Sequence, residues 1–277
     1  MKKIIATAVA AAFAVPVYAA DITISGDQEF SWQTNNGATT ASLDGDFNVK
    51  ASTETANGLS ISADINIAEN GADDGGASLT VKGPFGSVDL GDTSSATDAI
   101  DDVTDWGYVL TNGTGSGDAS VLWTLPSMVP GLSVYVSTAA DAADGAAQGG
   151  GAAHTGFAVK YSNSGLTIGF GQLDNDDGSE DQVVNATYSI GGLGLAMETH
   201  TATTVGGVET DTETVGVTYS MGDLTAAVET MEDGASDETT LGLHYGLGGG
   251  VTAFIETTED ANNAAEETTA VGLTMKF

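Results

Sequence analysis

From Asp21 onward, apolar and polar residues alternate along the chain with a period of two. In residues 59–67 every second position is apolar, from Leu59 to Ile67, and the residues between them are polar. The same alternation recurs at 157–161, 215–221 and 241–247. Because successive side chains of a β-strand point to opposite faces, each of these segments predicts a strand with one apolar face.

The connections between these segments predict how the strands are joined. About sixteen strand-like segments leave fifteen connections, which alternate between short and long. The short ones are centred on Asn57–Gly58, Gly83–Pro84, Pro126–Pro130, Asn163–Gly165, Gly191–Gly192, Met221–Asp223 and Gly248–Gly250, and the long ones lie near 34–40, 69–76, 92–118, 138–153, 173–180, 202–211, 232–238 and 259–266. Most loop acids fall in the long connections. This sorting is typical of an up-and-down antiparallel β-barrel in an outer membrane, with short turns at one end and longer loops at the other. A soluble sandwich has no reason to sort its loops in this way.

The N-terminus has the three parts of a secretory signal peptide. Lys2 and Lys3 precede an apolar stretch from Ile4 to Val17, and Val17, Tyr18 and Ala19 are small or permissive residues before a cleavage point. The stretch is too short for a spanning helix. We therefore expect cleavage after Ala19, with Ala20 as the second candidate. Cleavage after Ala19 leaves residues 20–277 as a single all-β transmembrane domain.

Charge excludes one class of partner. The chain has 39 acidic residues, only 6 Lys and Arg together, and a formal net charge of -33. Nucleic acid binding needs a basic face, so no nucleic acid partner is expected. The chain has no cysteine, which removes disulfides and thiolate metal sites. No arginine is present, and the predicted mature chain keeps only Lys50, Lys82, Lys160 and Lys276.

Three segments carry a resemblance to a known family. They are Asp21–Asp27 at the start of the mature chain, Leu79–Asp92 before the longest connection, and Met275–Phe277 at the end. With the alternating segments between them, they resemble the general diffusion porins of Gram-negative bacteria, particularly those of alphaproteobacterial type. The resemblance covers the mature chain from end to end.

The resemblance implies a homotrimer of 16-stranded barrels in the outer membrane, in contact with lipid and lipopolysaccharide. It also implies that the long third loop, about 92–117, folds into the lumen. There Asp98, Asp101, Asp102 and Asp105 would line the constriction, while Trp106 and Tyr108 would anchor the loop to the wall. Phe277 would be the terminal signal that the barrel-assembly machinery reads.

One departure from the family pattern shapes the expected function. Porins of this type usually set arginines and lysines opposite the acidic loop, and this chain offers mainly Lys50, which should point inward on the second strand. We therefore predict a water-filled channel for passive diffusion of small cations and polar solutes, with a preference for cations. The three histidines lie far apart in the sequence, and no catalytic constellation stands out, so no enzyme activity is expected.

The sequence leaves open whether the loop acids bind Ca²⁺ and whether the chain is a secreted protein of another class. No cofactor is required, but carboxylates such as Asp98, Asp101 and Asp102 offer the hard oxygen ligands that Ca²⁺ prefers. Ordinary solvated loops have similar acidic clusters. The alternative function is a secreted acidic β-rich adhesin or surface-layer protein whose loops are braced by Ca²⁺. Migration on a detergent gel with and without heating would separate the two, because a closed barrel resists unfolding without heat.

Overall fold

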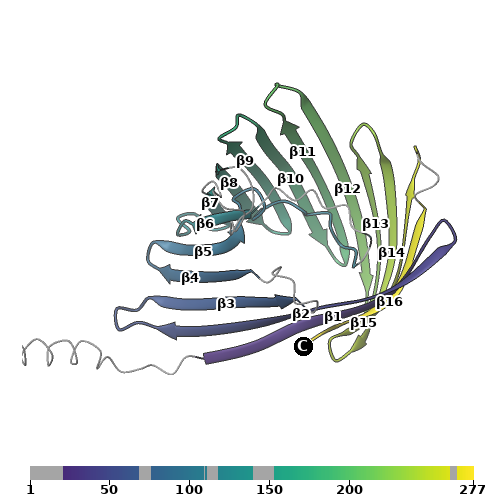
Figure 1. The fold of residues 1–277 in the computed structure, drawn as a ribbon, viewed down its shortest axis with the longest axis horizontal. Coiled ribbons are helices and arrows are strands. Elements are labelled where there is room, and N and C mark those ends of the chain that lie inside the picture. The colour runs from purple at the N-terminus through teal and green to yellow at the C-terminus, as the bar shows by residue number, and fades with distance from the viewer. Residues whose placement is uncertain (1–20, 69–75, 109, 111–117, 140–152, 263–266) are drawn as a thin grey trace, which may run out of the picture.

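Sixteen strands form one closed antiparallel barrel in the computed structural model (Figure 1). The structure describes residues 21–68, 76–108, 110, 118–139, 153–262 and 267–277. The predicted signal peptide, residues 1–19, lies outside the described residues. Within the described part of the chain, no helix is long and apolar enough to cross a membrane.

Every strand pairs with its neighbours in sequence. The strands are β1 (Asp21–Asn35), β2 (Ala38–Glu54), β3 (Ser60–Ala68), β4 (Ala77–Gly83), β5 (Gly86–Ser94), β6 (Asp118–Thr124), β7 (Leu132–Ala139), β8 (His154–Asn163), β9 (Leu166–Asn175), β10 (Glu180–Ile190), β11 (Leu193–Thr203), β12 (Glu209–Met221), β13 (Leu224–Glu232), β14 (Asp237–Gly248), β15 (Val251–Asp260) and β16 (Thr268–Lys276). β16 pairs with β1 and closes the barrel. The closure extends to the last residue, because Phe277 and Gly26 exchange two backbone hydrogen bonds of 3.0 Å.

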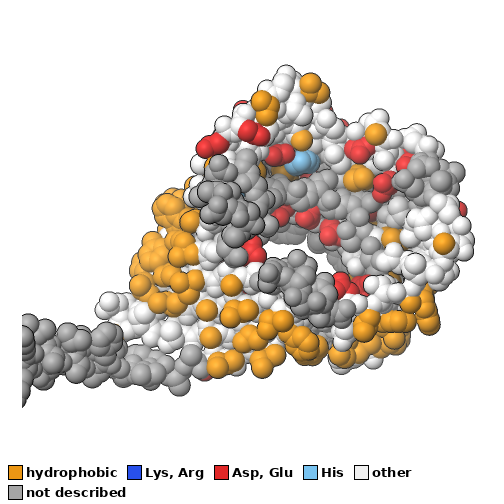
Figure 2. Space-filling view, viewed as in Figure 1, with side chains coloured by type: hydrophobic (Ala, Val, Ile, Leu, Met, Phe, Trp, Pro, Cys, Tyr) orange, Lys and Arg blue, Asp and Glu red, His pale blue; other side chains and the backbone are white. Residues whose placement is uncertain are grey.

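The alternation predicted from the sequence separates the outside of the barrel from its lumen. On β8, Phe157 is 45% exposed on the outside, whereas Ala158 is fully buried on the inside. Large apolar side chains are likewise exposed on many of the other strands, while many of the buried side chains are polar. Figure 2 shows hydrophobic side chains gathered over the outside and acidic ones around the central opening. A barrel of this kind places its apolar band toward lipid and its polar face toward water.

The fifteen predicted connections all occur, but strict alternation in length is wrong at the first one. The long loop expected at 34–40 is a two-residue turn, Asn36–Gly37, between strands of 15 and 17 residues. Both turn residues have positive φ, 50° and 79°. An Asn-Gly pair takes this conformation readily, and its twist matches that of the flanking strands. The Thr, Ser and Ala residues around it therefore continue the ladder.

Candidate functional site

The third loop begins as a compact turn packed on the inner wall. Ile100 is 2% exposed and packs in a small core with Ala96, Leu122 and Ala158. Backbone bonds from Ala99 to Ser95 and from Asp101 to Thr97 tighten this turn. The Ala96 N–H donates to Ser137 Oγ on β7 at 2.8 Å. The root of the loop is therefore held against β6, β7 and β8.

Lys160 reinforces this root. Its Nζ donates to the carbonyl oxygen of Ala99 at 3.1 Å and lies 5.6 Å from the centre of the Tyr135 ring. An ammonium over an aromatic face is attracted by the ring quadrupole. Lys160 on β8 therefore holds the first part of the loop, at Ala99, against the wall.

A glutamate and an asparagine hold the middle of the loop. Asn185 Nδ2 donates to the carbonyl oxygen of Ile100 at 2.6 Å. The two carboxylate oxygens of Glu198 accept from the N–H groups of Asp102 and Val103 at 3.3 and 3.5 Å. Glu198 is 3% exposed. This buried carboxylate thus satisfies two backbone donors that lie outside any strand.

A second glutamate holds the far part of the loop. Glu256 on β15 is 1% exposed, and its carboxylate accepts from the N–H groups of Tyr108 at 2.7 Å and Leu110 at 3.0 Å. His244 Nε2 lies 2.9 Å from the same carboxylate. Hydrogen bonds to an ionised acceptor are shorter and stronger than neutral ones. Glu256 is therefore the tightest described contact between this end of the loop and the wall.

Trp106 and Tyr108 lie against the same wall. The Tyr108 ring is 4.7 Å from the His244 ring and 5.3 Å from that of Phe254. The Trp106 ring is 5.7 Å from His244 and lies so close to Gly242 that a Cβ there would come within 2.1 Å of it. Both aromatic residues thus contact side chains of β14 or β15, and the glycine on β14 makes room for the indole. Their role as anchors of the loop stays a prediction.

The structure brings three of the predicted loop carboxylates together. Asp98, Asp101 and Asp102 each offer an oxygen within 4.8 Å of the others. Asp105 lies further along the loop, where desolvation raises the pKa of its carboxyl above the usual range, and the charges of Asp102 and Glu256 raise it further. Crowded carboxylates suit a cation. The calcium site stays a prediction.

Lys50 and Phe277 lie apart from this cluster. Lys50 points inward on β2, and its Nζ lies 3.6 Å from Asp64 Oδ2 on β3. Among the described residues, no ion pair joins it to the loop acids. The Phe277 ring packs edge-on against Phe47 at 5.7 Å, on the outside of the barrel.

Sequence reasoning missed Glu198, Glu256 and Asn185. Their signal is positional, because each is polar at an inward-facing position in the middle of a strand. Met197, the neighbour of Glu198 in sequence, is 55% exposed on the outer face. The parity of the strand therefore places Glu198 inside, but its partners in the loop are 95 and 96 residues away in the chain.

Comparison with known proteins gives a family and several related structures. A family model described as Gram-negative porin matches residues 6–265. A mutant of the Rh. blastica porin is 17% identical, with a TM-score of 0.71, covering 93% of this chain and all of the other. The OmpF structure from Salmonella typhi, in complex with daunomycin, is 13% identical with a TM-score of 0.77, covering 94% of this chain and 98% of the other. No curated protein matches the chain.

Proposed function

This chain belongs to the Gram-negative porin family, and we propose that the outer-membrane channel it forms prefers cations. The proposal rests on one observation: the loop held inside the barrel carries four carboxylates, and no ion pair joins them to a lysine among the described residues. Lys160 binds the Ala99 carbonyl and Lys50 pairs with Asp64. Fixed carboxylates lower the energy of a passing cation and raise that of an anion.

Bilayer conductance tests this proposal. Purified protein is reconstituted between two salt solutions of different concentration, and the reversal potential is measured. We expect the sign that indicates cation preference, with a magnitude that decreases at high salt because fixed charges are screened over about 8 Å at 0.15 M. An anion preference would reject the charge argument. Loss of any pore current from folded protein would reject the channel itself.

Lys50 offers a first prediction. Lys50→Glu changes the charge of the inner wall by two units beside Asp64, so the ratio of cation to anion permeability should rise by about twofold, a small effect because the site is half exposed. Lys82→Glu is the matched control, because Lys82 is exposed near the Pro84–Phe85 turn. If both variants leave the reversal potential unchanged, Lys50 does not belong to the constriction.

Acidification offers a second prediction. Because its pKa is raised, Asp105 takes up a proton at a pH where ordinary aspartates are still ionised. Wild type and Asp105→Asn should therefore differ in reversal potential at neutral pH and converge as the pH falls. Asp177 provides the contrast, since the backbone N–H and the hydroxyl of Ser179 lower the pKa of its carboxyl. Any difference made by Asp177→Asn should persist to lower pH. Parallel pH curves for the two variants would contradict the assignment.

Further features of the channel complete the proposal. The family and fold are those of channels, and we propose no catalytic activity and no required cofactor. Assembly as a homotrimer, contact with lipopolysaccharide, and recognition of Phe277 by the barrel-assembly machinery are proposals that rest on family membership. Binding of Ca²⁺ by Asp98, Asp101 and Asp102 would be tested by titrating Ca²⁺ against single-channel current.

A further inference from the structure

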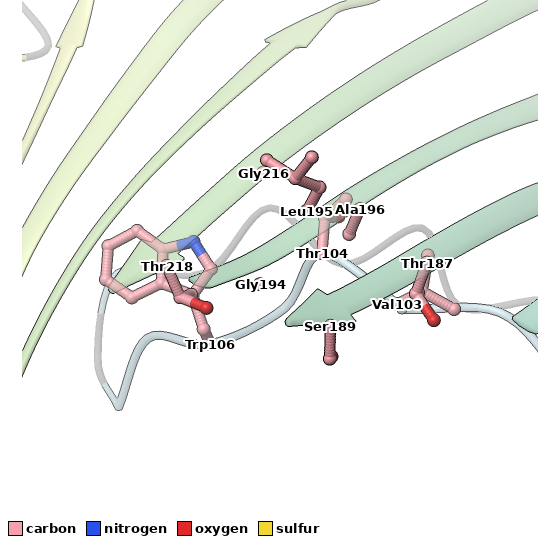
Figure 3. Close-up of a pocket in the computed structure, with 10 residues that line it drawn as sticks. All are labelled: Val103, Thr104, Trp106, Thr187, Ser189, Gly194, Leu195, Ala196, Gly216 and Thr218. Carbon is pink, nitrogen blue, oxygen red and sulfur yellow. The ribbon is translucent and has the colours of Figure 1, made fainter. Parts of the chain in front are cut away.

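We propose that a pocket between loop residues 103–106 and the inner wall of β10, β11 and β12 binds the ring of an uncharged polyhydroxylated solute, such as a hexose. The pocket has a volume of about 260 Å³ and is shown in Figure 3. This inference rests on the proposed function, because the solute reaches the pocket through the channel. It adds a binding site for uncharged solutes to a channel whose selectivity is otherwise electrostatic.

Small residues on the wall create the hollow. Gly194, Ala196 and Gly216 occupy inward-facing positions on β11 and β12, where neighbouring strands carry larger side chains. The loop passes over them with Val103 and Thr104. A Cβ at Gly216 would lie 3.5 Å from Thr104, an ordinary contact distance, so Thr104 passes over Gly216 with room for one methyl group. The pocket is somewhat smaller than the sites that hold drug-sized ligands, which suits a ligand of one ring.

The lining is uncharged, in contrast to the rest of the loop. None of its ten residues is Asp, Glu, Lys or His. Hydroxyl groups come from Thr187 and Ser189 on β10 and from Thr218 on β12. Each hydroxyl donates one hydrogen bond and accepts up to two, so it can pair with another hydroxyl in either direction. This set suits a polyol better than an ammonium ion or a carboxylate, each of which needs an opposite charge.

Trp106 supplies the remaining feature of a sugar site. Its indole gives an apolar face on which the C–H groups of a sugar ring can pack, and an N–H that donates a hydrogen bond. In Figure 3 the edge that carries Nε1 is turned toward the other lining residues. Nε1 is buried and has no hydrogen-bond partner among the described residues. Buried indole N–H groups usually have a partner, and a solute hydroxyl would provide one.

The test combines channel current with binding in detergent. Glucose is titrated while single-channel current is recorded, and half-saturation is compared between wild type, Ser189→Ala and Trp106→Phe. Each variant removes one donor and should raise the half-saturating concentration by about fivefold, the effect of one net hydrogen bond. Ser62→Ala on the inner face of β3 is the matched control and should leave it unchanged. Gluconate, the charged counterpart, should not saturate.

A second readout separates this inference from the channel proposal. Glucose should change the tryptophan fluorescence of the detergent-solubilised protein saturably in wild type and not in Trp106→Phe, because Trp32 and Trp123 are exposed on the outside. Saturable fluorescence without pore current would uphold the pocket and reject the channel. If current falls linearly with glucose concentration and equally in all variants, the pocket is overturned. A saturable effect that neither Ser189→Ala nor Trp106→Phe alters also overturns it. Equal binding of gluconate overturns the uncharged class.

Discussion

Replacing Asp98, Asp101, Asp102 and Asp105 together with asparagine is expected to lower the ratio of cation to anion permeability by about tenfold. A unit charge 4 Å from an ion in bulk water contributes about 1 kcal/mol. A passing ion lies farther than that from most of the four carboxylates, so their combined effect is about 1–2 kcal/mol, which corresponds to that ratio. Asparagine keeps the size of the side chain, so the width of the pore changes little. Reversal potentials at low salt measure the effect, because high salt screens it.

The matched control removes the same number of charges elsewhere. Four exposed acids lie outside the third loop: Asp176 and Asp177 in the turn after β9, Glu180 at the start of β10 and Glu232 at the end of β13. Replacing them with the corresponding amides changes the net charge equally but should alter the permeability ratio by less than about twofold. If the two quadruple variants behave alike, the overall charge of the chain sets the selectivity, and the third loop has no special part in it.

The strands could be predicted from the sequence because their signal is local. A period of two needs only neighbouring residues, and it assigned the inner and outer faces of β8 and β12 correctly. The first turn was harder, because Ser, Thr and Gly around Asn36–Gly37 are common in both loops and strands. There the propensity of the pair for a tight turn outweighed the polar composition that suggested a loop.

The contacts of the third loop could be predicted only in part. The expected role of Trp106 and Tyr108 came from the family resemblance, which names no partner for either residue. Strand alternation places Glu198 and Glu256 on the inner face, but they bind backbone N–H groups, which every residue except proline offers, so the sequence does not identify their partners. The Lys50–Asp64 pair was within reach of sequence reasoning, since both residues face inward on adjacent strands. Strand register determines which inward-facing residues lie opposite each other, and the register depends on the length of the turn between the strands.

Removing the carboxylate of Glu256 is expected to release the far part of the third loop. Glu256→Ala leaves the N–H groups of Tyr108 and Leu110 without their acceptor. A hydrogen bond to a charged group contributes about 1.5–3 kcal/mol, so the loss of two should raise the population of the released loop at least about 100-fold. Amide hydrogen exchange of residues 103–110 should accelerate accordingly, and single-channel current should become noisier. Glu256→Gln keeps one acceptor oxygen and should have a smaller effect.

Asp46→Asn is the control for this prediction. Asp46 faces inward on β2, and among the described residues it makes no hydrogen bond to the loop. The substitution removes one inward charge but no anchor, so exchange in 103–110 should stay as in wild type. The ladder of backbone hydrogen bonds around the barrel is untouched in all three variants, so each should migrate on a detergent gel as a folded barrel until it is heated. Unchanged exchange in folded Glu256→Ala would mean that the aromatic contacts of Trp106 and Tyr108 hold the loop without the carboxylate.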